Sequence, residues 1–137
     1  YHFMLPYSKW EYVAICYSES FESLSCGYEA AVWSLGGVAP EHRTDNLAAA
    51  AYFKDKKRHY TKGWQEVMGH YRVTPSCNNP GISHENGSVE KSNDLIKTAV
   101  RQTLALRGSS NFATISEYRE FLDELVVKRN SGRGSVL

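Results

Sequence analysis

Two separated stretches of the chain carry carboxylates where they could hold metal ions. Residues 42–46 (HRTDN) place Asp45 at the end of an extended segment, and residues 85–91 (ENGSVEK) place Glu90 near the start of a helix. Residues 52–107 carry ten Lys and Arg against five Asp and Glu. Carboxylate oxygens bind hard divalent cations, and clustered cations attract polyanions. The combination suits chemistry on a phosphodiester backbone.

Spacing alone leaves the choice of carboxylates open. Asp45 is followed by Asn46, and such a pair commonly forms a turn without binding a ligand. An acid near a helix start, such as Glu90, is also common because it interacts favourably with the helix dipole. Glu85 and Asp94 lie near Glu90 and could serve instead.

The cysteines and glycines show no pattern typical of a site. Cys16, Cys26 and Cys77 form no Cys-x-x-Cys pair and do not combine with the five histidines at zinc-binding spacing. We therefore expect reduced, mostly buried thiols. The chain contains no glycine-rich phosphate loop, and no motif marks a nucleophilic Ser/His/Asp or Cys/His set.

Length and composition predict one globular domain. The 137 residues, of which 42% are apolar, are enough for a single hydrophobic core. No apolar run approaches the roughly 20 residues that span a bilayer, and no signal segment opens the chain, which predicts a cytoplasmic protein without membrane partners. Because the chain begins at Tyr1 inside a predicted strand, we expect a fragment of a longer protein.

The order of predicted elements indicates an α/β fold. Extended segments are predicted over residues 1–7, 10–17, 38–44 and 73–77. Helices are predicted over residues 21–35, 62–71, 86–106 and 115–129. Residues 47–53 fit either a short helix or a further strand, and residues 54–59 predict an exposed basic connection. The first two strands form a hairpin, so we expect a mixed sheet.

Two groups of cations could contact a nucleic acid. The predicted helix of residues 86–106 carries Lys91, Lys97 and Arg101. The basic connection carries Lys56, Lys57 and Arg58. Both patterns also occur on ordinary solvated surfaces, so alone they favour nucleic acid only weakly.

Three separated motifs resemble IstA-type insertion-sequence transposases. They are residues 35–47 (LGGVAPEHRTDNL), residues 84–91 (HENGSVEK) and residues 106–112 (LRGSSNF), the last followed by Tyr118, Phe121, Leu122 and Lys128–Asn130. The resemblance covers nearly the whole chain and implies membership of the retroviral-integrase superfamily. It therefore implies a ribonuclease-H-like mixed sheet flanked by helices. It also implies a DNA transposase that performs metal-dependent strand cleavage and strand transfer.

The resemblance selects two catalytic residues. Asp45 matches the family's second aspartate, and Glu90 matches the glutamate of a Gly-x-Val-Glu pattern, which favours it over Glu85. Both would bind metal, with two Mg²⁺ ions in the intact site, for which Mn²⁺ can substitute. The family's first aspartate lies just upstream of the hairpin, so the resemblance implies that the metal site is incomplete within residues 1–137 and that the fragment alone is inactive.

The resemblance also implies DNA contacts and partners. Lys91, Asn93 and Lys97 would position DNA through its backbone, whereas Asp94 departs from related integrases, which can carry a lysine there. The implied partners are the element ends, target DNA, an ATP-dependent helper protein and further copies of the transposase on the DNA. The implied location is the bacterial cytoplasm, with nucleoid association when DNA is bound.

Residues 1–130 would thus form a partial integrase-type core, and residues 131–137 a mobile tail. The alternative is a catalytically inactive truncated remnant that retains only DNA binding. A third interpretation, an interaction module without a DNA role, requires the three motif matches to be coincidental.

Overall fold

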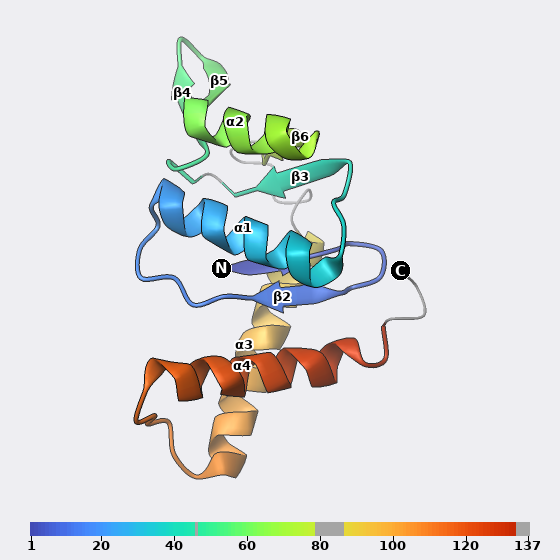
Figure 1. Ribbon diagram of the computed structural model, residues 1–137, viewed down its shortest axis with the longest axis vertical. Helices are drawn as coiled ribbons and strands as arrows, with labels where there is room; N and C mark the ends of the chain where they lie inside the picture. The colour runs from blue at the N-terminus through green and yellow to red at the C-terminus, as the bar shows by residue number, and fades with distance from the viewer. Residues whose placement is uncertain (46, 79–86, 134–137) are drawn as a thin grey trace. The chain divides into compact units, whose positions relative to one another are not determined.

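The computed structural model describes residues 1–45, 47–78 and 87–133 as a mixed α/β protein. Within these residues the chain forms four helices and three two-stranded sheets (Figure 1). It divides into two compact units. The first contains Tyr1 and Cys16–Glu85, and the second contains His2–Ile15 and Asn86–Leu137.

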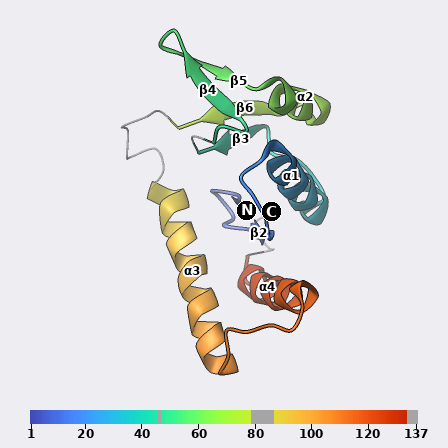
Figure 2. The ribbon, with the colours of Figure 1, turned by 90° about the vertical axis from the view of Figure 1, so that its left-hand side faces the viewer.

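The first unit combines two helices with two strand pairs. Its elements are α1 (Phe21–Leu35), β3 (Glu41–Thr44), β4 (Ala51–Lys54), β5 (Lys57–Tyr60), α2 (Lys62–Tyr71) and β6 (Thr74–Cys77). Strand β3 pairs in parallel with β6, and β4 pairs with β5 in an antiparallel hairpin (Figures 1 and 2). Parallel strands need a long crossover, which here consists of the hairpin and α2.

Local capping explains why both helices have their predicted bounds. The Ser20 side chain accepts a hydrogen bond from the Ser23 N–H, and α1 ends at Gly36, whose φ of 78° suits a residue without Cβ. The Thr61 side chain likewise accepts from the Trp64 N–H at the start of α2. The predictions for residues 21–35 and 62–71 are confirmed.

Aromatic side chains from α1, β3 and α2 form the core of the first unit. Tyr28 is 1% exposed and Trp64 is fully buried, and their ring centroids lie 5.8 Å apart in an edge-to-face arrangement. The His42 ring packs between them, 4.8 Å from Tyr28 and 5.6 Å from Trp64. Each such pair contributes about 0.5–1.5 kcal/mol beyond its area burial.

We expect this half-buried histidine to make the stability of the first unit pH-dependent. Desolvation lowers the pKa of His42 to about 4. Because the folded-state pKa lies below the unfolded value, the stabilisation is complete above about pH 6.5 and is lost as the pH falls toward 4, by roughly 3 kcal/mol. Urea unfolding followed across this range should show the loss, and His42→Phe should remove it. The His70→Gln variant, which changes an exposed histidine, should still lose stability as the pH falls. If His42→Phe shows the same pH profile as the wild type, the pH dependence does not come from His42.

The second unit packs a short hairpin against two helices. Its elements are β1 (His2–Met4), β2 (Glu11–Val13), α3 (Gly87–Arg107) and α4 (Ile115–Asn130). Strands β1 and β2 are antiparallel, with Phe3 opposite Tyr12. Helix α4 contacts β2 and α3, and α3 contacts β1. A core of Ile96, Leu125 and Val126 lies between the helices.

A buried carboxylate ties this hairpin to the end of α4. Glu11 is 0% exposed, and its carboxylate pairs with His2 Nε2 at 3.1 Å, with Arg129, and with Arg133 Nη1 at 3.0 Å. The Asn130 side chain accepts from the Glu11 N–H at 3.0 Å and donates to its carbonyl at 2.7 Å. The negative charge of the Glu11 carboxylate is therefore compensated by cations of the same unit, as a buried ion requires.

Four details differ from the sequence predictions. Residues 54–59 are not a simple connection, because Lys57–Tyr60 pairs with Ala51–Lys54 and residues 47–50 form a turn. The described strands pair in twos rather than in one continuous sheet, although both parallel and antiparallel pairs occur. The thiols are not mostly buried: Cys26 is exposed and the other two are half-buried. Residues 131–133, expected to be mobile, form a turn, and residues 134–137 lie outside the description.

Candidate functional site

Asp45 lies directly after β3, at the edge where the parallel pair ends. Thr44 is opposite Cys77 in the register, so Asp45 and Asn78 follow the carboxyl ends of adjacent parallel strands. Asn78 Nδ2 donates to Asp45 Oδ1 at 2.8 Å. The predicted placement of Asp45 at a strand end is confirmed. In α/β sheets such edges commonly hold functional sites.

Asn78 fixes the orientation of this carboxylate. Its own N–H donates to the Thr44 carbonyl at 3.3 Å, and its side chain is 7% exposed. An ionised carboxylate only accepts hydrogen bonds, so the amide nitrogen of Asn78 must face Asp45. Asn78 Oδ1 is then buried without a hydrogen-bond partner among the described residues. Asp45 itself is exposed to solvent and accessible to a ligand.

Arg58 connects the same asparagine to the β4–β5 hairpin. Its Nη2 donates to the Asn78 carbonyl, and its guanidinium lies over the Phe53 ring, 5.0 Å from the centroid. Arg58 is therefore half-buried and partnered, whereas Lys56 and Lys57 are exposed. Of the three cations predicted to contact DNA here, two face solvent and one holds the hairpin to the loop after β6.

Glu90 lies in the first turn of α3 and is exposed. At about 100° per residue, Lys97 and Arg101 share its face of the helix, and the buried Ile96 lies about 120° around from Glu90. Asp94 lies on that face as well, so the surface alternates between acids and cations. The predicted helix is present, and Lys97 and Arg101 share the Glu90 side of it; their role in DNA binding stays a prediction. Glu85 lies outside the described residues.

The remaining predicted contacts on α3 differ in their surroundings. Lys91 is exposed about 100° around the helix from Glu90. Asn93 is half-buried, and its side-chain oxygen is within hydrogen-bond distance of His2 Nδ1. Asn93 therefore links α3 to β1 rather than standing in solvent. Arg101 Nη2 donates to Thr98 Oγ1 at 3.1 Å on the helix surface.

Asp45 belongs to the first unit and Glu90 to the second, so their convergence stays a prediction. Across residues 1–45, 47–78 and 87–133, no three His, Cys, Asp or Glu side chains gather in a way that could hold a metal ion. The two carboxylates have the oxygen donors that Mg²⁺ prefers, which fits the expected metal in donor type.

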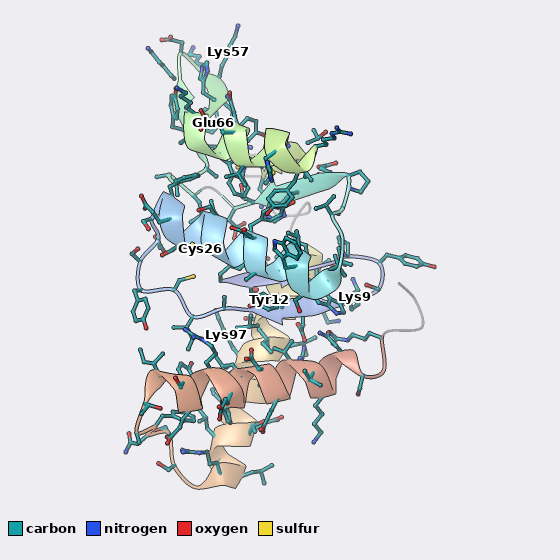
Figure 3. The ribbon with its side chains drawn as sticks, in the orientation of Figure 1. Lys9, Tyr12, Cys26, Lys57, Glu66 and Lys97 are labelled. Atoms are coloured by element: carbon teal, nitrogen blue, oxygen red, sulfur yellow. The ribbon has the colours of Figure 1, made fainter. Side chains whose placement is uncertain are left out.

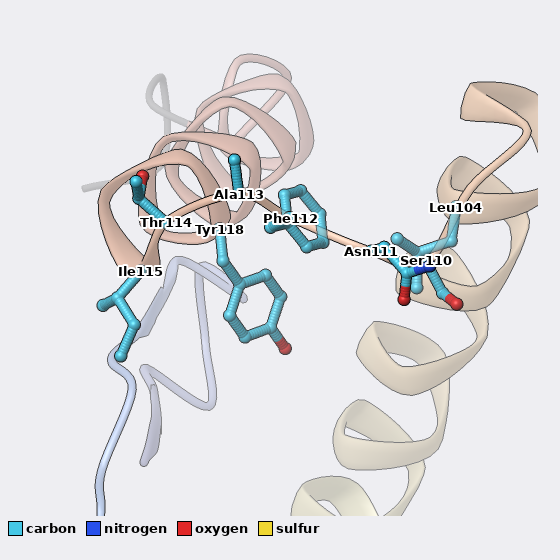
Figure 4. A pocket seen from close by; sticks show the side chains of 8 residues that line it. All are labelled: Leu104, Ser110, Asn111, Phe112, Ala113, Thr114, Ile115 and Tyr118. Atoms are coloured by element: carbon cyan, nitrogen blue, oxygen red, sulfur yellow. The ribbon is translucent and has the colours of Figure 1, made fainter.

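Two pockets formed by described residues are lined by other side chains. One, of about 640 Å³, follows the connection between α3 and α4, and Figure 4 shows its lining side chains, which include Leu104, Phe112 and Tyr118. No lining residue has a carboxylate, imidazole or thiol. Another, of about 340 Å³, lies between α1 and α2 and includes Glu29, Glu66 and His70.

Comparison with known proteins finds one clear relative among the curated proteins and no matching family model. The chain is 43% identical over 139 residues to a protein of Sinorhizobium fredii (strain NBRC 101917 / NGR234) described as "Uncharacterized protein y4jA/y4nE/y4sE". The match covers 98% of this chain and 27% of that protein, so the chain spans about a quarter of the relative's length. Among the helices of the described residues, none combines the length and apolarity that a bilayer crossing requires.

Sequence reasoning missed Asn78 as a site residue. The sequence marks it as the start of a turn, in Asn-Asn-Pro-Gly. The available signal was its place immediately after a predicted strand, the same position that drew attention to Asp45. The exposed aromatic residues of β4 and β5 were also missed, because no strand was predicted to end at residue 60.

Proposed function

We propose that this chain is part of the catalytic core of an IstA-type DNA transposase with a ribonuclease-H-like fold. One observation carries the proposal: Asp45 follows a strand of a parallel pair, and a buried asparagine from the neighbouring strand end orients its carboxylate. This position is the one the family resemblance assigns to the second catalytic aspartate. The mixed α/β composition and the acid in the first turn of α3 support the same assignment.

The proposed reaction cuts a phosphodiester bond at an element end with water and then joins the freed 3′-hydroxyl to target DNA. Asp45 and Glu90 would hold Mg²⁺, together with an aspartate supplied from before Tyr1. Bound metal ions stabilise the attacking and leaving oxygens of an in-line displacement. Asn78 holds the Asp45 carboxylate in one orientation, which removes a rotation that would otherwise have to be frozen on binding.

The cationic face of α3 would position the DNA. Lys97 and Arg101 are exposed on the same side of the helix as Glu90, roughly 10 and 16 Å further along its axis, so phosphates held by them would follow the helix away from that carboxylate. Such contacts set register and orientation and carry little sequence information. Lys56 and Lys57 add exposed charge in the first unit. An ATP-dependent helper protein and assembly of several copies on DNA belong to the same proposal.

A salt titration of duplex DNA binding tests the DNA contacts. We expect log K to fall linearly with log salt, and Lys97→Ala with Arg101→Ala to reduce the slope by about 2, since each phosphate contact contributes about 0.9. Fluorescence anisotropy with a labelled duplex measures both quantities. Lys128→Ala, an exposed cation on α4, is the matched control and should leave the slope unchanged.

The salt titration distinguishes the transposase from the two alternatives, an interaction module and an inactive remnant. Binding without a salt dependence would contradict phosphate contacts and leave an interaction module. Salt-dependent binding by a longer protein that never transfers strands would favour the inactive remnant.

A further inference from the structure

One face of the β4–β5 hairpin combines aromatic rings with cations. Tyr52 is opposite His59 and Lys54 is opposite Lys57 in the register, and side chains two residues apart along a strand point to the same side. These four side chains therefore share one face. The hairpin projects from the rest of the first unit, and Lys57 points away from it (Figures 1 and 3).

The two rings on this face are stacked and open to solvent. The ring centroids of Tyr52 and His59 lie 5.5 Å apart with an interplanar angle of 19°. Tyr52 is 49% exposed, and His59, Lys54 and Lys57 are also exposed. The face therefore presents two stacked rings beside two ammonium groups, a combination that suits a ligand with both a flat ring and negative charge.

The turn of the hairpin adds a third cation at a strained position. Asp55 and Lys56 both have positive φ, 52° and 60°, as in a two-residue type I′ turn. Glycine is the unstrained residue at the second position, so Lys56 is strained there. Residues 51–60 contain four Lys and Arg and one acid, Asp55. The hairpin is therefore strongly complementary to a polyanion.

We propose that this face binds unpaired nucleotides of the DNA, with a base stacked on the Tyr52–His59 pair and Lys54 and Lys57 at the adjoining phosphates. The inference rests on the proposed DNA function and specifies that the hairpin binds single-stranded DNA. Cations alone would suffice for the phosphates of a duplex, whose bases are already stacked. Rings exposed between cations are typical of surfaces that bind single strands.

The composition of the face favours nucleic acid over a phospholipid surface. Membrane-surface elements need an apolar side that enters the acyl region. Here the hairpin face contains no aliphatic residue, and on the other face Arg58 lies over the exposed Phe53 ring. The base-sized aromatic surface, with two ammonium groups beside it on the side of the turn, matches a nucleotide.

The test compares three labelled DNAs by anisotropy with the full 137-residue chain: an oligothymidine, the same strand with abasic sites, and a duplex of equal length. Tyr52→Ala with His59→Ala should weaken oligothymidine binding roughly 5- to 150-fold, the range for loss of one stacked base. Duplex binding should change less than about threefold. Tyr52→Phe, which keeps the ring, should bind normally. Tyr7→Ala, which removes a tyrosine that is 86% exposed in the second unit, should have no effect.

Three results would overturn the inference: equal affinity for the abasic strand, equal loss of duplex binding in the double variant, or preferential binding to vesicles containing phosphatidylserine. If salt-dependent duplex binding persists without a preference for unpaired bases, only the stacking role fails. If the wild-type chain binds no DNA, the DNA-binding function fails as well. Far-UV circular dichroism confirms that the exposed substitutions leave the fold intact.

Discussion

Asp45→Asn is expected to lower DNA strand transfer by roughly 1,000-fold or more while leaving DNA affinity within about threefold. The substitution removes one negative charge and one metal ligand but keeps the size of the side chain. Loss of a ligand forfeits several kcal/mol of transition-state stabilisation, and each 1.36 kcal/mol is a factor of ten in rate. The assay requires the longer protein that the proposal assumes, because the first aspartate is assigned to a position before Tyr1. Joining of a labelled element end to target DNA is the measurement.

The neighbouring residues provide graded controls. Glu90→Gln should match Asp45→Asn, whereas Glu85→Gln and Asp94→Asn should remain active within about tenfold. Asn78→Ala keeps the Asp45 carboxylate but removes the hydrogen bond that orients it. We therefore expect a 10- to 100-fold loss of strand-transfer activity and a higher Mg²⁺ concentration for half-maximal activity. If Asn78 had only a structural role, its substitution would not change the Mg²⁺ concentration for half-maximal activity. Strand transfer retained by Asp45→Asn would remove the site assignment.

The second large effect is on stability. Glu11→Gln should destabilise the second unit by roughly 3–5 kcal/mol, because it leaves Arg129 and Arg133 next to a buried neutral group. Hydrogen exchange of the α4 amides measures this unit directly. The exposed Glu124→Gln on the same helix should cost less than about 0.5 kcal/mol.

The pH dependence gives an independent check. Burial alone would raise the pKa of Glu11, but hydrogen bonds from His2 and Arg129 and the charges of Arg129 and Arg133 lower it to about 2. The folded-state pKa is thus below the unfolded value, so the stabilisation is complete above about pH 4.5 and is lost between 4.5 and 2. Wild type and Glu11→Gln should therefore converge in stability near pH 2. A difference that persists there would contradict the ion-pair explanation.

Elements with local signals could be predicted from the sequence. Ser20 and Thr61 cap α1 and α2, and Thr114 caps α4 by accepting from the Glu117 N–H. These bonds lie within one turn of the helix start, so a short stretch of sequence contains all that is needed. The hairpin at residues 51–60 lacked such a signal, because its turn is Asp55-Lys56 rather than Asn-Gly.

Features that depend on distant residues could not be predicted. The position of Asp45 follows from one segment, but its bond to Asn78 depends on which strands pair, over a separation of 33 residues. Glu11 stands in an apolar, aromatic stretch, and such an acid requires partners when buried. Its two arginine partners lie more than 100 residues later, and a single sequence does not identify them.

The composition of the second unit has a consequence for how the chain is made. Its hairpin comes from residues 2–15 and its helices from residues 87–130, and the segment Cys16–Glu85 of the first unit lies between these two parts in the sequence. During synthesis the hairpin leaves the ribosome first but must wait for Arg129, Asn130 and Arg133 before Glu11 can be neutralised. The segment Cys16–Glu85 is one continuous stretch, so its core of Tyr28, His42 and Trp64 can close before α3 and α4 have been synthesised. The second unit, which combines segments from both ends of the chain, therefore completes its folding after the first unit.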